Sequence, residues 1–204
     1  MELYVFPLGN VLLYPSSAKP LTIYEPRYIQ MVKDAVANQV NIALGFVDEP
    51  QKEYRYQVGE NLSFVRQVVG FGKPIIVDTR PDGSMVVFLQ GQGKASLGRV
   101  KGLDKPYIVC EAEEITENNQ LSVTAFQKFM LLQKVMVSWM QNHIPDPHVR
   151  TQFMSQIRTP DEVIGCYASY MVADHDLQQL ILESNDINEK VQLINTMVAS
   201  GELL

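Results

Sequence analysis

Few residues of this 204-residue chain have the types and spacing that phosphate chemistry requires. The nearest approach to a phosphate-binding loop is the segment GQGKAS at residues 91–96. Such loops surround phosphates with backbone N–H groups and need four residues between their two glycines, and a helix follows them. Here the glycines are closer together and strand-like residues follow, while Ser96 replaces the third glycine of a dinucleotide-binding loop. The segment favours a turn or β-bulge, and we expect no cofactor.

Nucleophiles and bases of the chain show no catalytic pattern. No G-x-S-x-G motif presents a serine for attack, and a Ser-His-Asp triad is defined by geometry that a sequence does not supply. His143 and His148 flank a proline-rich break and His175 lies between two aspartates, which is typical of solvated loop histidines. A zinc site made of His143, His148 and Cys166 would lack the usual ligand spacing. We therefore expect neither an enzyme nor a metal site.

Composition narrows the class of protein further. The formal net charge is −6, which argues against general nucleic-acid binding. No stretch approaches the ~20 consecutive apolar residues of a membrane span, and the first residues include Glu2 and no basic leader, so we expect no secretory signal. Cys110 and Cys166 are far apart and form no C-x-x-C pair. Two free thiols indicate a cytoplasmic protein.

The first part of the chain predicts short strands and one inserted helix. An apolar strand through Phe6 enters a Gly-Asn turn, a second apolar run stops at Pro15, and a third strand covers residues 21–24. Pro26 then opens a helix at no cost, because the first helical N–H has no partner. The apolar residues of this helix lie at helical spacing and predict one buried face. They are Tyr28, Met31, Val32, Ala35 and Val36.

Further strands are predicted up to about residue 117. Residues 41–47 and 62–69 read as strands, and residues 75–77 and 85–89 form a hairpin around Asp82-Gly83. A last strand, residues 107–110, is expected to end at the acidic run 111–114. Short strands at this spacing indicate a closed or nearly closed small barrel.

After a linker at residues 118–120, the pattern becomes helical. One helix carries apolar residues at helical spacing and ends before Pro145, and Thr159 and Glu162 form a capping box for another. Asp186 begins the last helix. We predict an α+β protein: a β-rich pseudo-barrel with one inserted helix over residues 1–117, followed by a helical bundle over residues 118–204.

The string PLGNVLLYP at residues 7–15, followed by PLTIYEPRY at residues 20–28, closely resembles the opening of the N-terminal domain of Lon proteases. Weaker similarity continues through residues 58–69, 82–94, 106–114 and 176–197, with Lys94 where an arginine is common in that family. The resemblance implies a PUA-like barrel with an attached helical bundle. It also implies a domain that contacts protein substrates and does not cleave them.

Lon proteases continue into ATPase and protease domains, and this chain has no G-x-x-x-x-G-K-[ST] motif. The resemblance therefore predicts a stand-alone, non-catalytic, polypeptide-binding module of a bacterial-type cytoplasm. Its expected partners are unfolded or apolar polypeptide segments and a protease. Nucleic acid and membrane are not expected as partners.

Three groups of residues are candidates for the binding surface. Tyr24, Arg27 and Tyr28 could rim a groove, although an arginine at a helix start more often forms an ion pair within its domain. Phe129, Met136 and Met140 would suit a soft contact surface for varied apolar peptides, and the alternative is that they form the core of the bundle. The edge strands of the barrel are the third candidate, because unpaired backbone groups accept an added strand.

The alternative function is RNA or nucleotide binding, because PUA-related folds include RNA-binding proteins. It predicts a basic, aromatic-lined groove. Tyr54, Arg55 and Tyr56, with Arg66 or Lys73, are the one local cluster of this kind.

Overall fold

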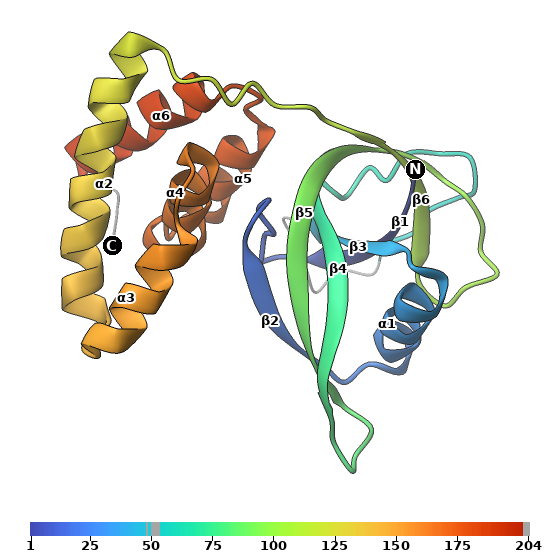
Figure 1. Ribbon diagram of the computed structural model, residues 1–204. Helices are drawn as coiled ribbons and strands as arrows, with labels where there is room; N and C mark the ends of the chain where they lie inside the picture. The colour runs from blue at the N-terminus through green and yellow to red at the C-terminus, as the bar shows by residue number, and fades with distance from the viewer. Residues whose placement is uncertain (48, 50–53, 202–204) are drawn as a thin grey trace. The chain divides into compact units, whose positions relative to one another are not determined.

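A closed ring of strands organises the N-terminal part of the chain (Figure 1). The computed structural model describes residues 1–47, 49 and 54–201. Its six-stranded sheet has the order β2-β5-β4-β3-β1-β6, and β5 also pairs with β6, so β1, β3, β4, β5 and β6 close on one another while β2 stays outside the ring. The strands are β1 (Glu2–Leu8), β2 (Ala18–Ile23), β3 (Asn41–Phe46), β4 (Val68–Thr79), β5 (Met85–Val100) and β6 (Ile108–Glu114).

Two positions in the strands of the ring require glycine, because another segment of backbone lies directly against them. A Cβ on Gly70 would lie 1.7 Å from the carbonyl oxygen of Leu13, and one on Gly91 would lie 2.0 Å from that of Tyr14. The run 11–14 therefore lies directly against the barrel, with Leu12, Leu13 and Tyr14 buried. Counting this run among the strands was wrong, because residues 11–14 form no strand and are buried by packing against Gly70 and Gly91 of the barrel.

The helix α1 (Pro26–Asn38) covers one end of the barrel core. Its residues Tyr28, Met31, Val32 and Ala35 are buried, as their spacing predicted, whereas Val36 is exposed. They join a cluster formed by the inward side chains of several strands. A second cluster fills the other end of the ring, with Phe71 and Leu97 among its members. The predicted barrel with one inserted helix is confirmed.

A polar network fastens α1 to the loop that leads into β6. The Asp34 carboxylate accepts hydrogen bonds from the Tyr107 hydroxyl (2.6 Å), the Lys105 ammonium (3.1 Å) and the Gln30 amide (2.7 Å). The bond from Tyr107, followed by those from Lys105 and Gln30, lowers the pKa of Asp34 below its ordinary value. Tyr107 is buried, and its ring packs 5.0 Å from that of Tyr4.

Two predicted strands differ from the structure. Residues 62–67 form a loop, and its Leu62 and Val65 belong to the second core cluster. The alternation of apolar and polar residues in this segment therefore comes from two buried loop side chains and not from one face of a strand. β6, in contrast, continues to Glu114 and does not end before the acidic run. Glu113 and Glu114 pair through their backbones with Ser96 and Ala95, and strand pairing does not depend on the charge of outward side chains.

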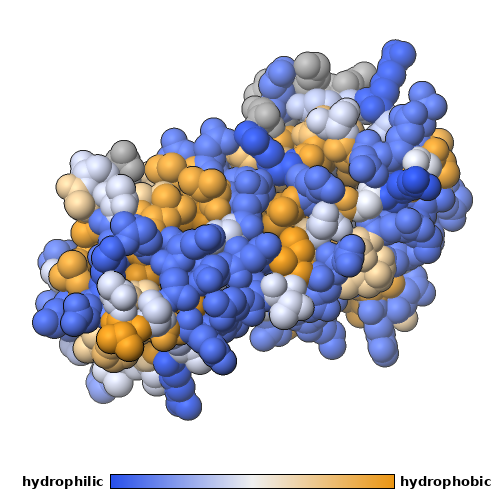
Figure 2. Space-filling model, turned by 90° about the horizontal axis from the view of Figure 1, so that it is seen from above, coloured by the Kyte–Doolittle hydropathy of each residue, from blue (hydrophilic) through white to orange (hydrophobic). Residues whose placement is uncertain are grey.

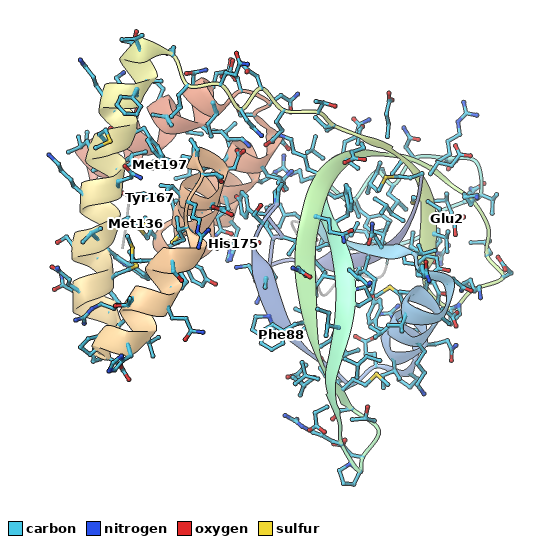
Figure 3. All side chains as sticks on the ribbon, viewed as in Figure 1. Glu2, Phe88, Met136, Tyr167, His175 and Met197 are labelled. Atoms are coloured by element: carbon cyan, nitrogen blue, oxygen red, sulfur yellow. The ribbon has the colours of Figure 1, made fainter. Side chains whose placement is uncertain are left out.

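The C-terminal part of the chain consists of helices (Figure 1). They are α2 (Val123–His143), α3 (Pro147–Gln156), α4 (Pro160–Cys166), the π-helical segment η1 (Tyr167–Met171), α5 (His175–Glu183) and α6 (Ile187–Ser200). Met136, Tyr167 and Met197 are buried in its core, and Figure 3 shows them between the helices. The Tyr167 hydroxyl donates to the carbonyl of Leu132 within α2 (2.7 Å). The capping box of Thr159 and Glu162 is present as predicted.

A buried ion pair holds the start of this helical part together. The Lys190 ammonium of α6 lies 2.7 Å from the Glu117 carboxylate, and both side chains are nearly inaccessible to solvent. The next residue, Asn118, donates its N–H to the Asn185 carbonyl, and its own carbonyl accepts from the N–H of Ile187. The segment predicted as a linker is thus attached to the start of α6.

By its internal contacts the chain divides into two units, Met1–Ile115 (the barrel unit) and Thr116–Leu204 (the helical unit). That each unit folds by itself, as the predicted domains 1–117 and 118–204 imply, stays a prediction.

We expect the substitution Tyr107→Phe to lower the free energy of unfolding by about 1.5 kcal/mol at pH 7, because it removes a hydrogen bond to a carboxylate. A carboxylate whose pKa is lowered in the folded state stabilises the fold above its unfolded pKa of ~4, and this stabilisation is lost as the pH falls through the folded pKa. The difference between the two proteins should therefore shrink at pH 3. Urea unfolding at both pH values measures it, with Tyr24→Phe as the control. An equal loss at both values would contradict the assignment.

The pair of Lys190 and Glu117 predicts a non-additive response. Lys190→Met should cost about 3 kcal/mol, because it leaves the Glu117 carboxylate buried without its cation. The double variant Lys190→Met/Glu117→Gln should recover much of that loss, since no charge is then left buried. Urea unfolding measures both, and the exposed Lys134→Met in α2 is the matched control. Additive losses in the double variant would contradict the coupling.

Candidate functional site

The outward face of β2, β5 and β4 carries a row of apolar side chains. Phe88 of β5 is opposite Pro20 of β2 on one side and Ile75 of β4 on the other. Phe88 is 41% exposed, Ile75 is 46% exposed, and Pro20 is also exposed. We call Pro20, Phe88 and Ile75 the apolar row. Figure 3 shows Phe88 on the hairpin of β4 and β5, and Figure 2 shows hydrophobic side chains at the surface among hydrophilic ones.

Strand alternation explains why these apolar residues face solvent. Met85, Val87 and Leu89 point into the barrel core, so the residues between them point outward. A bulge between Ile76 and Asp78 places Val77, also exposed, beside the row. The sequence analysis missed Phe88 and Ile75. The signal for Phe88 was its position out of phase with the core residues of the same strand.

The strand β2 has an open edge, and Pro20 lies at its centre. The Gly91 N–H donates to the Ser17 carbonyl (2.8 Å). By the alternation of an antiparallel ladder, residues 19, 21 and 23 then face β5, and residues 18, 20 and 22 face the open edge. Proline has no N–H to offer there, which is how edge strands limit pairing with a foreign chain. Strand addition at β2 would therefore lack a hydrogen bond at its middle position.

The predicted residues near α1 separate into exposed and internal ones. Tyr24 directly follows β2 and is 74% exposed. The Arg27 guanidinium lies 2.8 Å from the Glu25 carboxylate and 4.5 Å above the ring of Tyr28. Tyr28 is buried, with its ring 4.1 Å from that of Phe6. The alternative of an ion pair within the domain describes Arg27, and a binding role for these three residues stays a prediction.

The predicted residues of α2 lie in the interior of the helical unit. Phe129, Met136 and Met140 are all buried, as the core alternative predicts, so a partner would not reach them in this conformation. The same helix carries a second, outward apolar stripe, which sequence reasoning did not separate from the first. Its exposed members are Val123, Phe126, Met130 and Val137. A binding role for Phe129, Met136 and Met140 stays a prediction.

The histidines and cysteines of the described residues belong to no metal-binding group. No group of three or more His, Cys, Asp or Glu residues there could hold a metal ion. The Nδ1 atom of His143 is 2.8 Å from the carbonyl of Trp139, on whose ring the imidazole stacks. Cys110 and Cys166 are buried free thiols, and burial raises the pKa of each to about 12.

Three residues of the cluster named for RNA binding contact aromatic rings of the barrel unit. The ring of Tyr54 is stacked on that of Phe64 at 4.1 Å, and Tyr56 also contacts Phe64. Arg66 lies 6.0 Å above the ring of Phe46. Phe64 thus covers one face of the Tyr54 ring, which reduces the aromatic surface that base stacking would use. No helix of the described residues is both long and apolar enough to cross a membrane.

Comparison with known proteins identifies similar chains. A family model described as the ATP-dependent protease La (LON) substrate-binding domain matches residues 2–200. Curated relatives include the Lon protease of Syntrophomonas wolfei, 25% identical over 97% of this chain and 24% of its own length. Another is the Lon protease of Escherichia coli strain K12, 23% identical over 98% of this chain and 25% of its own. The chain thus spans about a quarter of the length of these relatives.

Solved structures share the fold. The N-terminal domain of the Mycobacterium avium complex Lon protease matches with a TM-score of 0.72 at 14% identity, covering 96% of this chain and 97% of that one. A Lon N-terminal domain protein from Xanthomonas campestris matches with a TM-score of 0.65 at 16% identity, covering 95% and 96%. The predicted α+β fold is confirmed. The alternative of RNA or nucleotide binding gains no support from these comparisons.

The raised thiol pKa values predict slow reaction with thiol reagents. At pH 8 both Cys110 and Cys166 should stay protonated and shielded, because the thiolate is the reactive form. We expect an aromatic disulfide reagent to label neither cysteine in the folded protein and both after unfolding in urea. Absorbance of the released thiolate measures this. Rapid labelling of a native cysteine, located by mass spectrometry, would contradict the prediction.

Proposed function

Because the chain belongs to the family of ATP-dependent protease La (LON) substrate-binding domains, we propose that it binds apolar segments of polypeptides on the apolar row of its barrel unit. In this proposal it recognises substrates and does not cleave them. The observation that carries the proposal is the row itself: an aromatic and an aliphatic side chain stand exposed and adjacent on paired strands, beside a proline. Isolated exposed apolar residues need no explanation, but a contiguous set indicates an interaction site.

The physical chemistry of the row fits a weak and unselective contact. Covering an exposed Phe or Ile side chain contributes about 1–2 kcal/mol each, and the row is short. The backbone beneath it is held by strand pairing on both sides of β5, so little ordering is needed on binding. A polypeptide that also covers Val77 and Tyr24 would gain further apolar area. We expect dissociation constants in the micromolar range, which suits transient clients.

The absence of catalysis is part of the proposal. Its supports are the burial of both thiols and the contacts of His143 with Trp139. We further propose that the protein works in the cytoplasm and that a protease receives or competes for its clients. The cytoplasmic proposal is supported by the two free cysteines.

The outward stripe of α2 is the competing surface for the same function. It is apolar, but the exposed Lys134 lies among its members. We therefore place the contact on the barrel unit, and the test below includes α2.

We expect Phe88→Asp to weaken binding of a labelled unfolded polypeptide at least tenfold, because a carboxylate replaces the aromatic centre of the row and must be desolvated in the contact. Fluorescence anisotropy titration gives the dissociation constants. The matched control is Leu103→Asp, which introduces the same charge at an exposed leucine elsewhere in the barrel unit. Circular dichroism confirms that each variant is folded.

A third variant, Met130→Asp, tests the outward stripe of α2. Loss of binding in Met130→Asp with unchanged binding in Phe88→Asp would overturn the proposed location. Unchanged binding in all three variants would exclude both surfaces.

A further inference from the structure

A cavity of about 390 Å³ lies between the end of α1 and the strands β4 and β5. Its polar lining residues are Lys73, Gln39, Asn41 and Gln92. Val36 and Val40 supply apolar walls. The helix α1 packs beside β4 in this region, as Figure 1 shows.

The charge carried by the residues that line this cavity is positive and comes from Lys73. No Asp or Glu is among its lining residues. Within the described residues, the Lys73 ammonium has no ion pair or hydrogen bond, and the three side-chain amides have none either. A cation and amide donors without partners around a partly apolar hollow are the groups that recognise a carboxylate.

The C-terminal end of α1 weakens the positive potential of the cavity without cancelling it. Helix carboxyl termini carry a partial negative charge from their last carbonyls. Here the carbonyl of Ala35 accepts the N–H groups of both Gln39 and Val40, so part of that charge is satisfied. The full positive charge of Lys73 exceeds the remaining partial charge of the helix end.

The strand register links the cavity to the apolar row. Lys73 lies two residues before Ile75 on β4 and opposite Gln90, so it shares the outward face of the row about 7 Å from Ile75. The same spacing separates alternate residues of an extended polypeptide. A client whose apolar side chain covers Phe88 and Ile75 would therefore bring a group one or two residues away to Lys73.

We propose that this cavity binds a carboxylate of the polypeptide client, so that the preferred clients carry a carboxylate directly beside an apolar residue. This inference rests on the proposed function and names its substrate class. Lys73 is the cation, and the amides of Gln39, Asn41 and Gln92 donate to the carboxylate oxygens. The carboxylate is supplied by a free chain end or by an Asp or Glu side chain.

Three fluorescent peptides with one common apolar core separate these sources. The first ends in a free carboxylate, the second in an amide, and the third ends in an amide but has an Asp two residues after the core. We expect at least one carboxylate peptide to bind the wild-type protein about fivefold more tightly than the amide peptide, a typical strength for an exposed ion pair. The preference should fall as salt rises from ~0.05 to ~0.5 M.

Variants of Lys73 decide whether the cavity is responsible. Lys73→Gln should abolish the preference while leaving binding of the amide peptide unchanged, and Lys73→Arg should retain it. The matched control is Lys33→Gln, which removes an exposed lysine of α1 that does not line the cavity.

The outcomes distinguish this inference from the proposed function. Equal affinity of all three peptides, with binding lost in Phe88→Asp, would overturn the carboxylate site and leave the apolar row in place. A carboxylate preference that persists in Lys73→Gln would also overturn the site. No binding of any peptide to the wild-type protein would overturn the proposed function and this inference with it.

Discussion

The strand β5 sets the architecture of the barrel unit, because it is long enough to pair with three other strands. This strand of 16 residues pairs with β4 along its course, with β2 near its start and with β6 near its end. The ring closes only because β6 pairs with both β5 and β1. Closure removes the open edges of five strands and leaves that of β2, where Pro20 limits pairing. The core, the exposed row and the position of α1 all follow from this arrangement.

The pairing of β5 with two neighbouring strands also explains why an apolar surface exists on this protein. Where β5 pairs with β2 and β4, its inward side chains join the core cluster that α1 covers, and the outward Phe88 is exposed. A strand in the middle of three is rigid, so Phe88 and Ile75 are held side by side without further support. Rigidity of this kind lowers the entropic cost of binding and compensates for a small contact area.

Polar interactions then fix the elements around the barrel and within the helical unit. The carboxylate of Asp34 attaches α1 through Tyr107 and Lys105, and this attachment positions the end of α1 that borders the cavity with Lys73. In the helical unit, the buried pair of Glu117 and Lys190 has the corresponding role at the start of α6. In both, a carboxylate is paired with a lysine, and the pair in the helical unit is buried, where low dielectric surroundings make an unpaired charge costly.

The sequence by itself determined the fold class, the family and most elements. Proline at the start of α1, the Asp-Gly turn of the hairpin and the capping box of α4 are local signals, and local signals depend on neighbouring residues only. Tertiary structure alone decided which apolar residues are covered. Phe129 and Phe126 have the same chemistry on one helix, yet the first is buried and the second exposed, because only packing defines the inner face. Likewise, the register between strands places Phe88 beside Ile75 and Lys73 beside the end of α1, and register is a relation between distant segments that no local pattern specifies.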